Sequence, residues 1–215
     1  MASRDDISLA GLAHDLNNVF QTLVGVAMQL ENEPELAAAI LRCVERGQAI
    51  SAGLSKESSS LTPFGSILDN AATFLRDFQA ATKTPVVRIA GDVDPTIALP
   101  NAGAWERVLI NLFLNSMRAM PQGGTIQVIA RKIPGATQIY VGDEGCGIAE
   151  HLLATLFEPH VSGNDSTGLG LSIVDSIVRA HQGRIEASNR AEGTGAEFVI
   201  TLRAGAKSRA VKVGR

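Results

Sequence analysis

Aromatic residues are scarce in this chain of 215 residues, at 4% of the sequence with one Trp and one Tyr. A surface that stacks the bases of a nucleic-acid strand needs several exposed rings, so the composition disfavours that kind of binder. A net charge of −3 also excludes a globally basic nucleic-acid-binding protein. We therefore expect no nucleic-acid partner.

Cysteine, histidine and long apolar runs are scarce as well. Cys43 and Cys146 are too few for a disulfide framework and do not have CxxC spacing. None of the four histidines pairs with a cysteine or another histidine at metal-ligand spacing. No run reaches about 18 apolar residues, and the first residues lack the basic and apolar regions of a signal peptide. We expect a cytoplasmic protein with no membrane segment in this chain.

Residues 1–60 carry an apolar pattern that is typical of packed helices. At alternating steps of three and four lie Leu9, Leu12, Leu16, Val19, Leu23, Val26 and Leu30. Pro34 interrupts the pattern, and a second series follows over residues 36–54. Two antiparallel helices of this kind form a hairpin, and one hairpin of about 55 residues buries too little apolar surface to stand alone. The sequence therefore predicts a homodimer in which two hairpins form a four-helix bundle.

Beyond residue 60, expected helices alternate with short β-rich segments. The helices are expected at 65–81, 102–120 and 171–181, and the strands at 85–90, 95–99, 125–133, 137–141, 184–188 and 197–202. This order predicts an α+β fold, a sandwich of one helix layer on one mixed sheet. The expected domains are residues 1–60, residues 61–204 and a flexible basic tail at 205–215.

His14 lies at the outermost position of the first heptad series, so we expect its imidazole on the exposed face of the helix. Asp15 is adjacent, and Asn18 lies one turn further along the same face. An isolated exposed histidine is more often an ordinary surface residue. An imidazole beside a carboxylate, however, keeps one nitrogen nucleophilic near neutral pH. His14 is therefore a candidate nucleophile, with Asp15 as its base or orienting group.

The expected helix at 102–120 carries two amides and a cation on one side. Asn111 and Asn115 are four residues apart, and Arg118 lies three residues beyond Asn115. Amide oxygens suit Mg²⁺, and a guanidinium suits a phosphate. These three residues are candidates for binding the phosphates and the metal of a nucleotide.

Two glycine-containing segments complete the candidate nucleotide site. Asp143 follows an expected strand and can accept a hydrogen bond from an exocyclic amine such as that of adenine. Gly145 and Gly147 allow a close backbone approach beside it. A second segment opens the helix at 171–181, where unpaired N–H groups bind anions; it contains Thr167, Gly168, Leu169 and Gly170.

Together these segments resemble the catalytic core of bacterial two-component sensor histidine kinases, over about residues 5–203. GLAHDLNNVF resembles the phosphoacceptor box, NLFLNSMRAM the asparagine box, DEGCGI the first glycine box, LFEP the phenylalanine box and TGLGLSIV the second glycine box. The resemblance implies a dimerisation and phosphotransfer hairpin followed by an ATP-binding domain. That domain has the Bergerat fold, which DNA gyrase and the mismatch-repair ATPases share.

The resemblance also implies roles for single residues, with ATP and Mg²⁺ as cofactors. His14 would be phosphorylated, Asn115 would bind the metal, and Asp143 would bind adenine. The remaining implied pocket residues are Asn111 and Arg118 near the phosphates, with Gly145, Gly147, Gly168 and Gly170 shaping the pocket. The chain departs from the family pattern at His160, where an aromatic is usual, and at Ser166, where glycine is usual. Both positions bear on the geometry of the lid expected at residues 162–167.

The expected function is that of an ATP-dependent protein histidine kinase. It would autophosphorylate His14 and pass the phosphoryl group to an Asp of a response-regulator receiver domain. Asn18 is a candidate for positioning the water of the reverse, phosphatase reaction.

Two other functions remain open at this stage. One is an ATP-independent dimeric histidine phosphotransferase, whose nucleotide motifs would normally be eroded. The other is an ATP hydrolase. It is disfavoured because Asn111 stands where the hydrolases of the wider superfamily place a general-base Glu, and an amide cannot accept a proton at pH 7.

Overall fold

The structure is a computed structural model that describes residues 19–20, 23–27, 40, 44, 47, 60–82, 84–158 and 170–203. By its contacts the chain divides into two compact units, built mainly of residues 1–59 and of residues 60–163 with 168–215. The predicted basic tail lies outside the described residues, as do six of the candidate site residues: His14, Asp15, Asn18, Thr167, Gly168 and Leu169.

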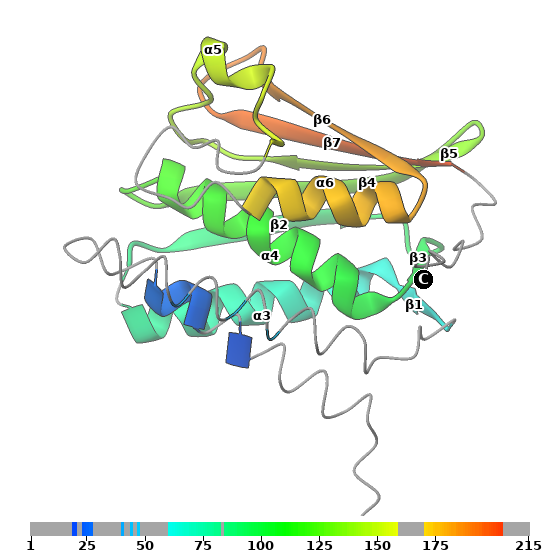
Figure 1. Cartoon of the computed structure of the whole chain (residues 1–215), viewed down its shortest axis with the longest axis horizontal. Helices are drawn as coiled ribbons and strands as arrows, with labels where there is room; N and C mark the ends of the chain where they lie inside the picture. The colour runs from blue at the N-terminus through cyan, green and yellow to red at the C-terminus, as the bar shows by residue number, and fades with distance from the viewer. Residues whose placement is uncertain are drawn as a thin grey trace, which may run out of the picture. The chain divides into compact units, whose positions relative to one another are not determined.

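A mixed five-stranded sheet forms one layer of the second unit, in the order β2-β4-β5-β7-β6 (Figure 1). Its strands are β2 (Val87–Val93), β4 (Gly124–Ile133), β5 (Ala136–Gly142), β6 (Gly183–Asn189) and β7 (Ala196–Arg203). The β2–β4 pair is parallel, whereas the other neighbouring strands are antiparallel. The chain passes through a helix between β2 and β4, which is the long crossover that parallel neighbours need.

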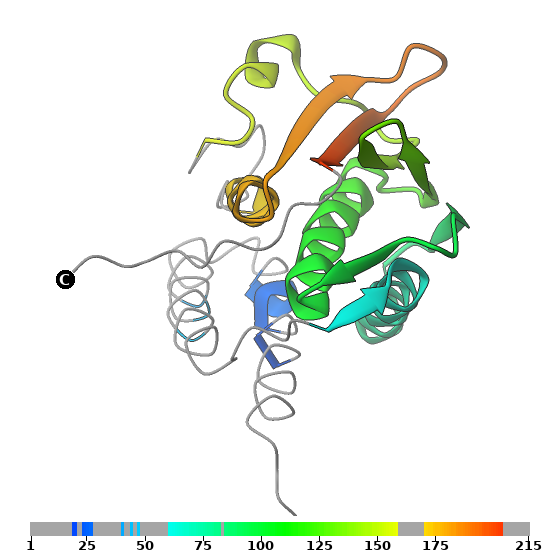
Figure 2. The same cartoon turned by 90° about the vertical axis from the view of Figure 1, so that its right-hand side faces the viewer.

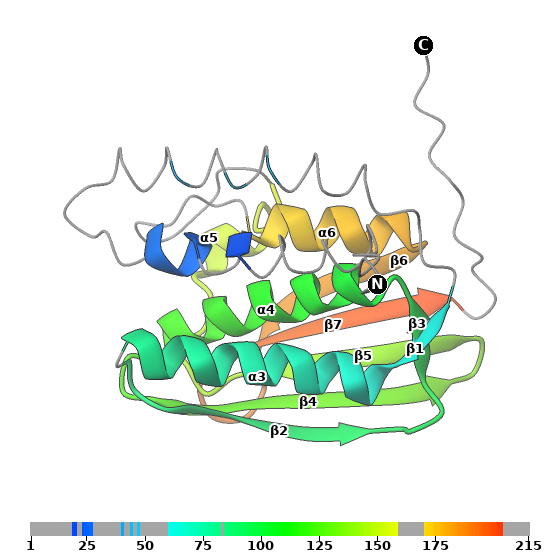
Figure 3. The ribbon, with the colours of Figure 1, turned by 90° about the horizontal axis from the view of Figure 1, so that it is seen from below.

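Three helices cover one face of this sheet (Figures 2 and 3). They are α3 (Phe64–Thr82), α4 (Ala102–Ala119) and α6 (Gly170–Ala180), and α4 contacts both of the others. A small antiparallel pair, β1 (Leu61–Pro63) and β3 (Ala98–Pro100), leads into α3 and α4 respectively. The short helix α5 (Glu150–Leu153) lies between β5 and α6 in the sequence.

The core lies between the helix layer and the sheet. Fully buried residues of α4 include Val108, Leu112 and Phe113. On β4 the buried residues alternate with more accessible ones, starting from Ile126 and Val128, because successive strand residues point to opposite faces. One face of the sheet is therefore apolar. The buried residues of α4 are apolar as well, with the exception of Ser116.

The predicted sandwich of one helix layer on one mixed sheet is confirmed for this unit. The predicted helices at 65–81, 102–120 and 171–181 are observed within one residue at each end. The strand predicted at 85–90 instead runs from Val87 to Val93, and the next begins at Ala98. Asp94 makes the turn between them, because its Oδ1 accepts hydrogen bonds from the backbone N and the Oγ1 of Thr96. The sequence pattern had indicated neither β1 nor α5.

In the first unit, two helical residues that are far apart in the sequence are in contact. A Cβ added to Gly47 would lie 2.4 Å from Cζ of Phe20, so the aromatic ring packs directly on the glycine. Phe20 lies 13 residues before Glu33, and Gly47 lies 13 residues after Pro34. These equal distances on the two sides of the break are those expected of a helical hairpin that turns at Pro34. The four-helix bundle itself stays a prediction. Among the helices of the described residues, none has both the length and the apolarity that a membrane crossing requires.

Candidate functional site

The side chain of Asp143 is almost completely buried at the end of β5, with 2% of the residue exposed. Its Oδ1 accepts hydrogen bonds from the backbone N of Gly145 at 3.0 Å and of Ala196 at 3.1 Å. Its Oδ2 accepts one from Oγ of Ser116 at 2.9 Å. A carboxylate loses much solvation energy on burial, and these three donors replace it. Asp143 thus accepts hydrogen bonds from three separate groups through its two oxygens.

The turn between β6 and β7 closes over the backbone of Asp143. The backbone N of Asp143 donates to the carbonyl of Ala196 at 2.9 Å, and Nη1 of Arg190 donates to the carbonyl of Asp143 at 3.2 Å. Gly195 has a φ of +118°, and a Cβ added there would lie 1.9 Å from the Asp143 carbonyl oxygen. Only glycine permits this approach.

Gly145 brings the loop after Asp143 against the end of α4. A Cβ on Gly145 would lie 2.6 Å from Cβ of Ala119 and 2.8 Å from its carbonyl oxygen. The next backbone N, of Cys146, donates to that same carbonyl at 3.2 Å. The close approach expected at Gly145 is therefore present, and it satisfies one of the carbonyls that a helix end leaves unpaired.

Asn189 holds the other end of the same loop. Its Oδ1 accepts from the backbone N of Ile148 at 2.6 Å, and its Nδ2 donates to the carbonyl of Ile148 at 2.8 Å. Gly147, just before, has a φ of +77°, and a Cβ there would lie 2.7 Å from Asn189 Oδ1. Contacts with the end of α4 and with Asn189 thus hold the loop that follows the buried carboxylate at two points.

The two candidate amides on α4 are both half-buried, and each is engaged in a different way. Asn111 donates from Nδ2 to the carbonyl of Arg107 at 2.7 Å. Its Oδ1 would lie 3.1 Å from a Cβ added to Gly170, the first residue of α6, so the amide oxygen faces the start of that helix. The structure therefore brings Asn111 and Gly170, two of the predicted phosphate-site residues, together.

One turn further along α4, Nη1 of Arg118 donates to Oδ1 of Asn115 at 3.2 Å. The Arg118 residue is accessible to solvent, yet the protein around its guanidinium desolvates it and lowers its pKa. It remains charged, as arginine does in proteins. Arg118 and Asn115 thus present a cation and an amide oxygen side by side.

Glu106 is the acidic residue of α4 that lies nearest in sequence to these amides. Its Oε1 accepts a hydrogen bond from Nδ2 of Asn70, on α3, at 2.6 Å. Asn111 instead faces α6, on the other side of the helix. Glu106 is therefore held away from the candidate phosphate site and cannot serve there as a base.

The side chains around Asn115 suit a metal ion that binds together with a nucleotide. Within the described part of the chain no three His, Cys, Asp or Glu side chains cluster in a way that could hold a metal. Mg²⁺ prefers oxygen ligands, keeps several waters and uses one or two protein groups together with substrate phosphates. The Asn115 amide oxygen has two lone pairs, of which Arg118 uses one. This oxygen can therefore contribute to such a site.

A groove of about 630 Å³ lies elsewhere, between α3 and β2. None of the candidate nucleotide residues lines it. Its lining includes Leu68 and Leu75 on α3 and Val87 and Ile89 on β2, and Nε2 of Gln79 donates to the Val87 carbonyl at 3.3 Å. This groove plays no part in the candidate site.

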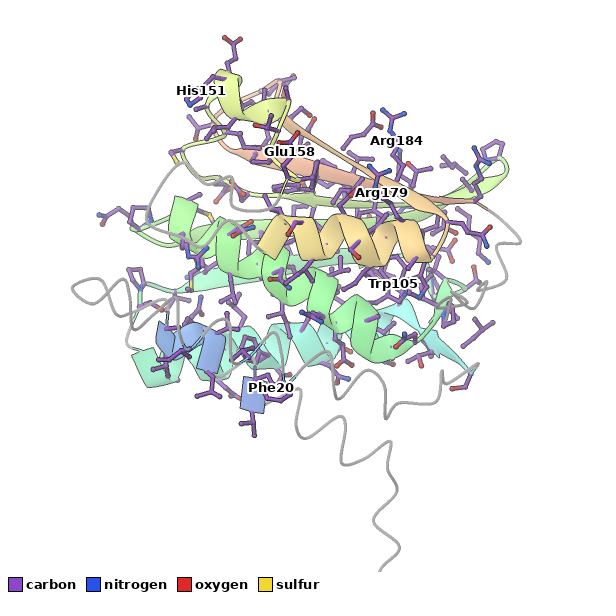
Figure 4. The ribbon with its side chains drawn as sticks, viewed as in Figure 1. Phe20, Trp105, His151, Glu158, Arg179 and Arg184 are labelled. Atoms are coloured by element: carbon purple, nitrogen blue, oxygen red, sulfur yellow. The ribbon has the colours of Figure 1, made fainter. Side chains whose placement is uncertain are left out.

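Packing between α4 and α6 positions the candidate phosphate-binding residues. Trp105, near the start of α4, is 1% exposed, and its ring centroid lies 5.0 Å from that of His181, just after α6 (Figure 4). Nδ1 of His181 lies 2.9 Å from the Ile177 carbonyl oxygen. Since Asn111 faces the start of α6 and Trp105 meets its end, the two helices run in opposite directions.

Comparison with known proteins places this geometry in a family. Residues 101–206 match the sequence family described as histidine kinase-, DNA gyrase B-, and HSP90-like ATPase. The chain carries a sensor histidine kinase core with this type of ATPase domain. The matched segment of this histidine kinase core contains every candidate residue from Asn111 to Gly170.

Individual relatives support the same branch. The sensory histidine kinase/phosphatase NtrB of Salmonella typhimurium strain LT2 is 31% identical over 206 residues, which cover 86% of this chain and 58% of NtrB. The sensor histidine kinase ZraS of Escherichia coli O157:H7 is 40% identical over 97 residues, 45% of this chain and 21% of ZraS. The full-length ShkA structure, in complex with AMPPNP, has a TM-score of 0.57 at 25% identity and covers 94% of this chain and 47% of ShkA. The chain thus spans between about a fifth and three fifths of these curated relatives.

Three residues that hold the candidate site in place had not been predicted: Ser116, Asn189 and Arg190. Ser116 offered one signal, because it is a polar residue on the apolar side of α4. Asn189 and Arg190 offered none, since their partners lie 41 and 47 residues away in the sequence.

Proposed function

We propose that this histidine kinase core binds ATP with Mg²⁺ and autophosphorylates His14. Residues 61–204 would form the ATP-binding domain, residues 1–60 the dimerisation and phosphotransfer domain, and residues 205–215 a flexible basic tail. The observation that carries the proposal is the buried Asp143 carboxylate, held by three donors within the segment that matches the ATPase family. AMPPNP is an ATP analogue, and its presence in the ShkA complex supports the same ligand class here.

The adenine end of the site would use Asp143. Each carboxylate oxygen can accept about two hydrogen bonds, and Oδ2 accepts one from Ser116. The remaining capacity suits the exocyclic amine of adenine. The glycine-lined loop on both sides of Asp143 would let the base approach the backbone.

The phosphate end would use α4 and the start of α6. Asn115 would ligate Mg²⁺, which neutralises phosphate charge, while Asn111, Arg118 and the segment from Thr167 to Gly170 would contact the phosphates. Because Asn111 is an amide and Glu106 is held by Asn70, no described carboxylate is placed to activate water there. The γ-phosphoryl group would therefore be kept for His14, with Asp15 as base or orienting group.

The exposed seam of the first unit supports the homodimer. Val19, Leu23 and Val26 belong to the predicted heptad series and are 54%, 39% and 46% exposed in the single chain. A second copy that covered this seam would complete the four-helix bundle.

From phosphorylated His14 the phosphoryl group would pass to an Asp of a response-regulator receiver domain, and Asn18 would assist the reverse phosphatase reaction. Since ATP and receiver domains are cytoplasmic substrates, we place this activity in the cytoplasm. The ATP-independent relay is disfavoured because the Asp143 site retains all its donors.

The decisive test combines nucleotide binding with autophosphorylation of the whole chain. We expect Mg²⁺-dependent ATP binding, and transfer of label from γ-labelled ATP to give an acid-labile, alkali-stable phosphoprotein. The His14→Gln variant should bind ATP normally and incorporate no label. Acid-stable phosphate on Ser or Thr, or ATP binding without any transfer to His14, would overturn the proposal.

A further inference from the structure

We propose that Ser116 is a positioning residue that holds Oδ2 of the Asp143 carboxylate and thereby sharpens selection of a 6-amino purine over a 6-oxo purine. The inference rests on the proposed function, because it assumes that Asp143 faces the purine. It concerns a residue of α4 that contributes neither to the phosphates nor to the metal in the proposed site.

The two oxygens of Asp143 are held in different ways. Oδ1 receives two backbone donors, from Gly145 and Ala196, at 3.0 and 3.1 Å. Those two bonds hold Oδ1 and restrain rotation about the Cβ–Cγ bond, a torsion with broad preferences, but they leave Oδ2 without a donor of its own. The Ser116 hydroxyl, 2.9 Å from Oδ2, is the side-chain donor that holds this second oxygen.

The hydroxyl of Ser116 is committed to this bond. Ser116 is 1% exposed and lies on the buried side of α4, together with Leu112 and Phe113. A serine within a helix often donates to the carbonyl four residues earlier, whereas this hydroxyl donates to Asp143, 27 residues away. A buried hydroxyl without a partner would be destabilising, so the apolar surroundings strengthen the preference for this single arrangement.

The orientation of Oδ2 matters for the choice of base. A 6-amino group presents a hydrogen to the carboxylate, whereas a 6-oxo group presents lone pairs and is repelled. Discrimination of this kind is strong only when the polar group of the site is fixed and would otherwise stay unpaired. If Oδ2 loses the Ser116 donor, it can take a water or another donor when an oxo purine is bound, and the penalty for the wrong base falls.

The test compares binding of MgATP and MgITP to the full chain, by competition against one fluorescent ATP analogue. We expect Ser116→Ala to weaken ATP binding about tenfold and to reduce the ATP-to-ITP preference by about fivefold, as expected for the loss of a hydrogen bond to a charged group. Ser116→Thr keeps the hydroxyl and should retain the preference to within about twofold.

A matched control removes a similar bond elsewhere. Thr96 Oγ1 donates to Asp94 Oδ1 at 2.6 Å in the turn after β2, and Thr96→Ala should leave both affinities and their ratio unchanged. Should Ser116→Ala fail to fold, Ser116→Cys provides a weaker donor of similar size and should show an intermediate ATP-to-ITP preference.

The inference is overturned if Ser116→Ala, or Ser116→Cys in its place, weakens the binding of ATP and of ITP by the same factor. A purely structural role of Ser116 would lower both affinities together. It is also overturned if the variant matches the wild type in both affinities. If the wild-type chain binds neither nucleotide, the proposed function itself fails, and that result is distinct from either of these.

Discussion

Arg118 donates from Nη1 to Oδ1 of Asn115, one helical turn earlier on α4, at 3.2 Å. The amide oxygen proposed to ligate Mg²⁺ is therefore the same atom that a cation already contacts. Because Arg118 and the metal would share this oxygen, binding of the metal would affect the contact with Arg118. A substitution of Asn115 should therefore alter the Mg²⁺ dependence of nucleotide binding most strongly.

We expect Asn115→Ala to abolish the gain in ATP affinity that Mg²⁺ provides, because the change removes the one amide oxygen proposed to bind the metal. Titrations of the full chain with ATP, with and without Mg²⁺, should show at least about a tenfold loss with the metal and little change without it. Asn70→Ala is the matched control, since Asn70 is an amide on the neighbouring helix that bonds Glu106. An Mg²⁺ effect retained in Asn115→Ala would remove Asn115 from the metal site.

Asn111→Glu should convert part of the kinase activity into ATP hydrolysis. The amide of Asn111 faces the start of α6, where the phosphates are proposed to lie, and a carboxylate there could accept a proton from water. Phosphate release should rise about tenfold or more above the wild type, while the yield of phosphorylated His14 falls. Glu106→Gln, on the α3 side of the same helix, should change neither quantity. Unchanged hydrolysis in a variant that still binds ATP would contradict this placement of Asn111.

Local patterns predicted the three long helices and the strands of the five-stranded sheet in the second unit, but not their long-range contacts. The β4–β5 hairpin follows from two β-rich runs around Pro134 and Gly135, and α4 follows from its apolar period. The parallel β2–β4 pairing and the sheet order depend on how separate elements pack, which a local pattern does not encode. The strand β1 has three residues, too few to show a period at all.

The same distinction applies to the candidate site. Asn111, Asn115 and Asp143 could be named because each stands in a short motif with recognisable chemistry. The contact of Ser116 with Asp143 spans 27 residues and that of Asn189 with Ile148 spans 41, so neither leaves a local signature. What the structure adds is therefore the set of groups that hold the functional residues in place.

Gly195→Ala should disrupt both stability and nucleotide binding. Its φ of +118° is unfavourable for alanine, and the new Cβ would lie 1.9 Å from the Asp143 carbonyl oxygen, so the backbone beside the carboxylate must move. We expect a loss of about 3 kcal/mol or more in the free energy of unfolding, measured with urea, together with a loss of ATP binding.

Gly193→Ala separates backbone strain from this clash. Gly193 also has a positive φ, +81°, but no neighbouring atom lies within 4 Å of an added Cβ. The Gly193→Ala variant should lose only about 1–2 kcal/mol in the free energy of unfolding, and it should retain ATP binding. Equal effects of the two substitutions would show that the contact with Asp143 does not matter.

Val26→Glu should dissociate the proposed homodimer. Val26 is 46% exposed in the single chain, and in the predicted bundle it would face the second copy, where an unpaired charge is strongly disfavoured. Light scattering should show the wild type as a dimer and the variant largely as a monomer. The dissociation constant of the dimer should rise at least about tenfold.

Val86→Glu is the control. Val86 is 63% exposed on the other unit, so this substitution should leave the dimer intact. The ATP affinity of Val26→Glu should equal that of the wild type, since the Asp143 site is built wholly from residues beyond 60. A wild-type chain that is monomeric, or a Val26→Glu variant that remains dimeric, would rule out this seam as the dimer interface.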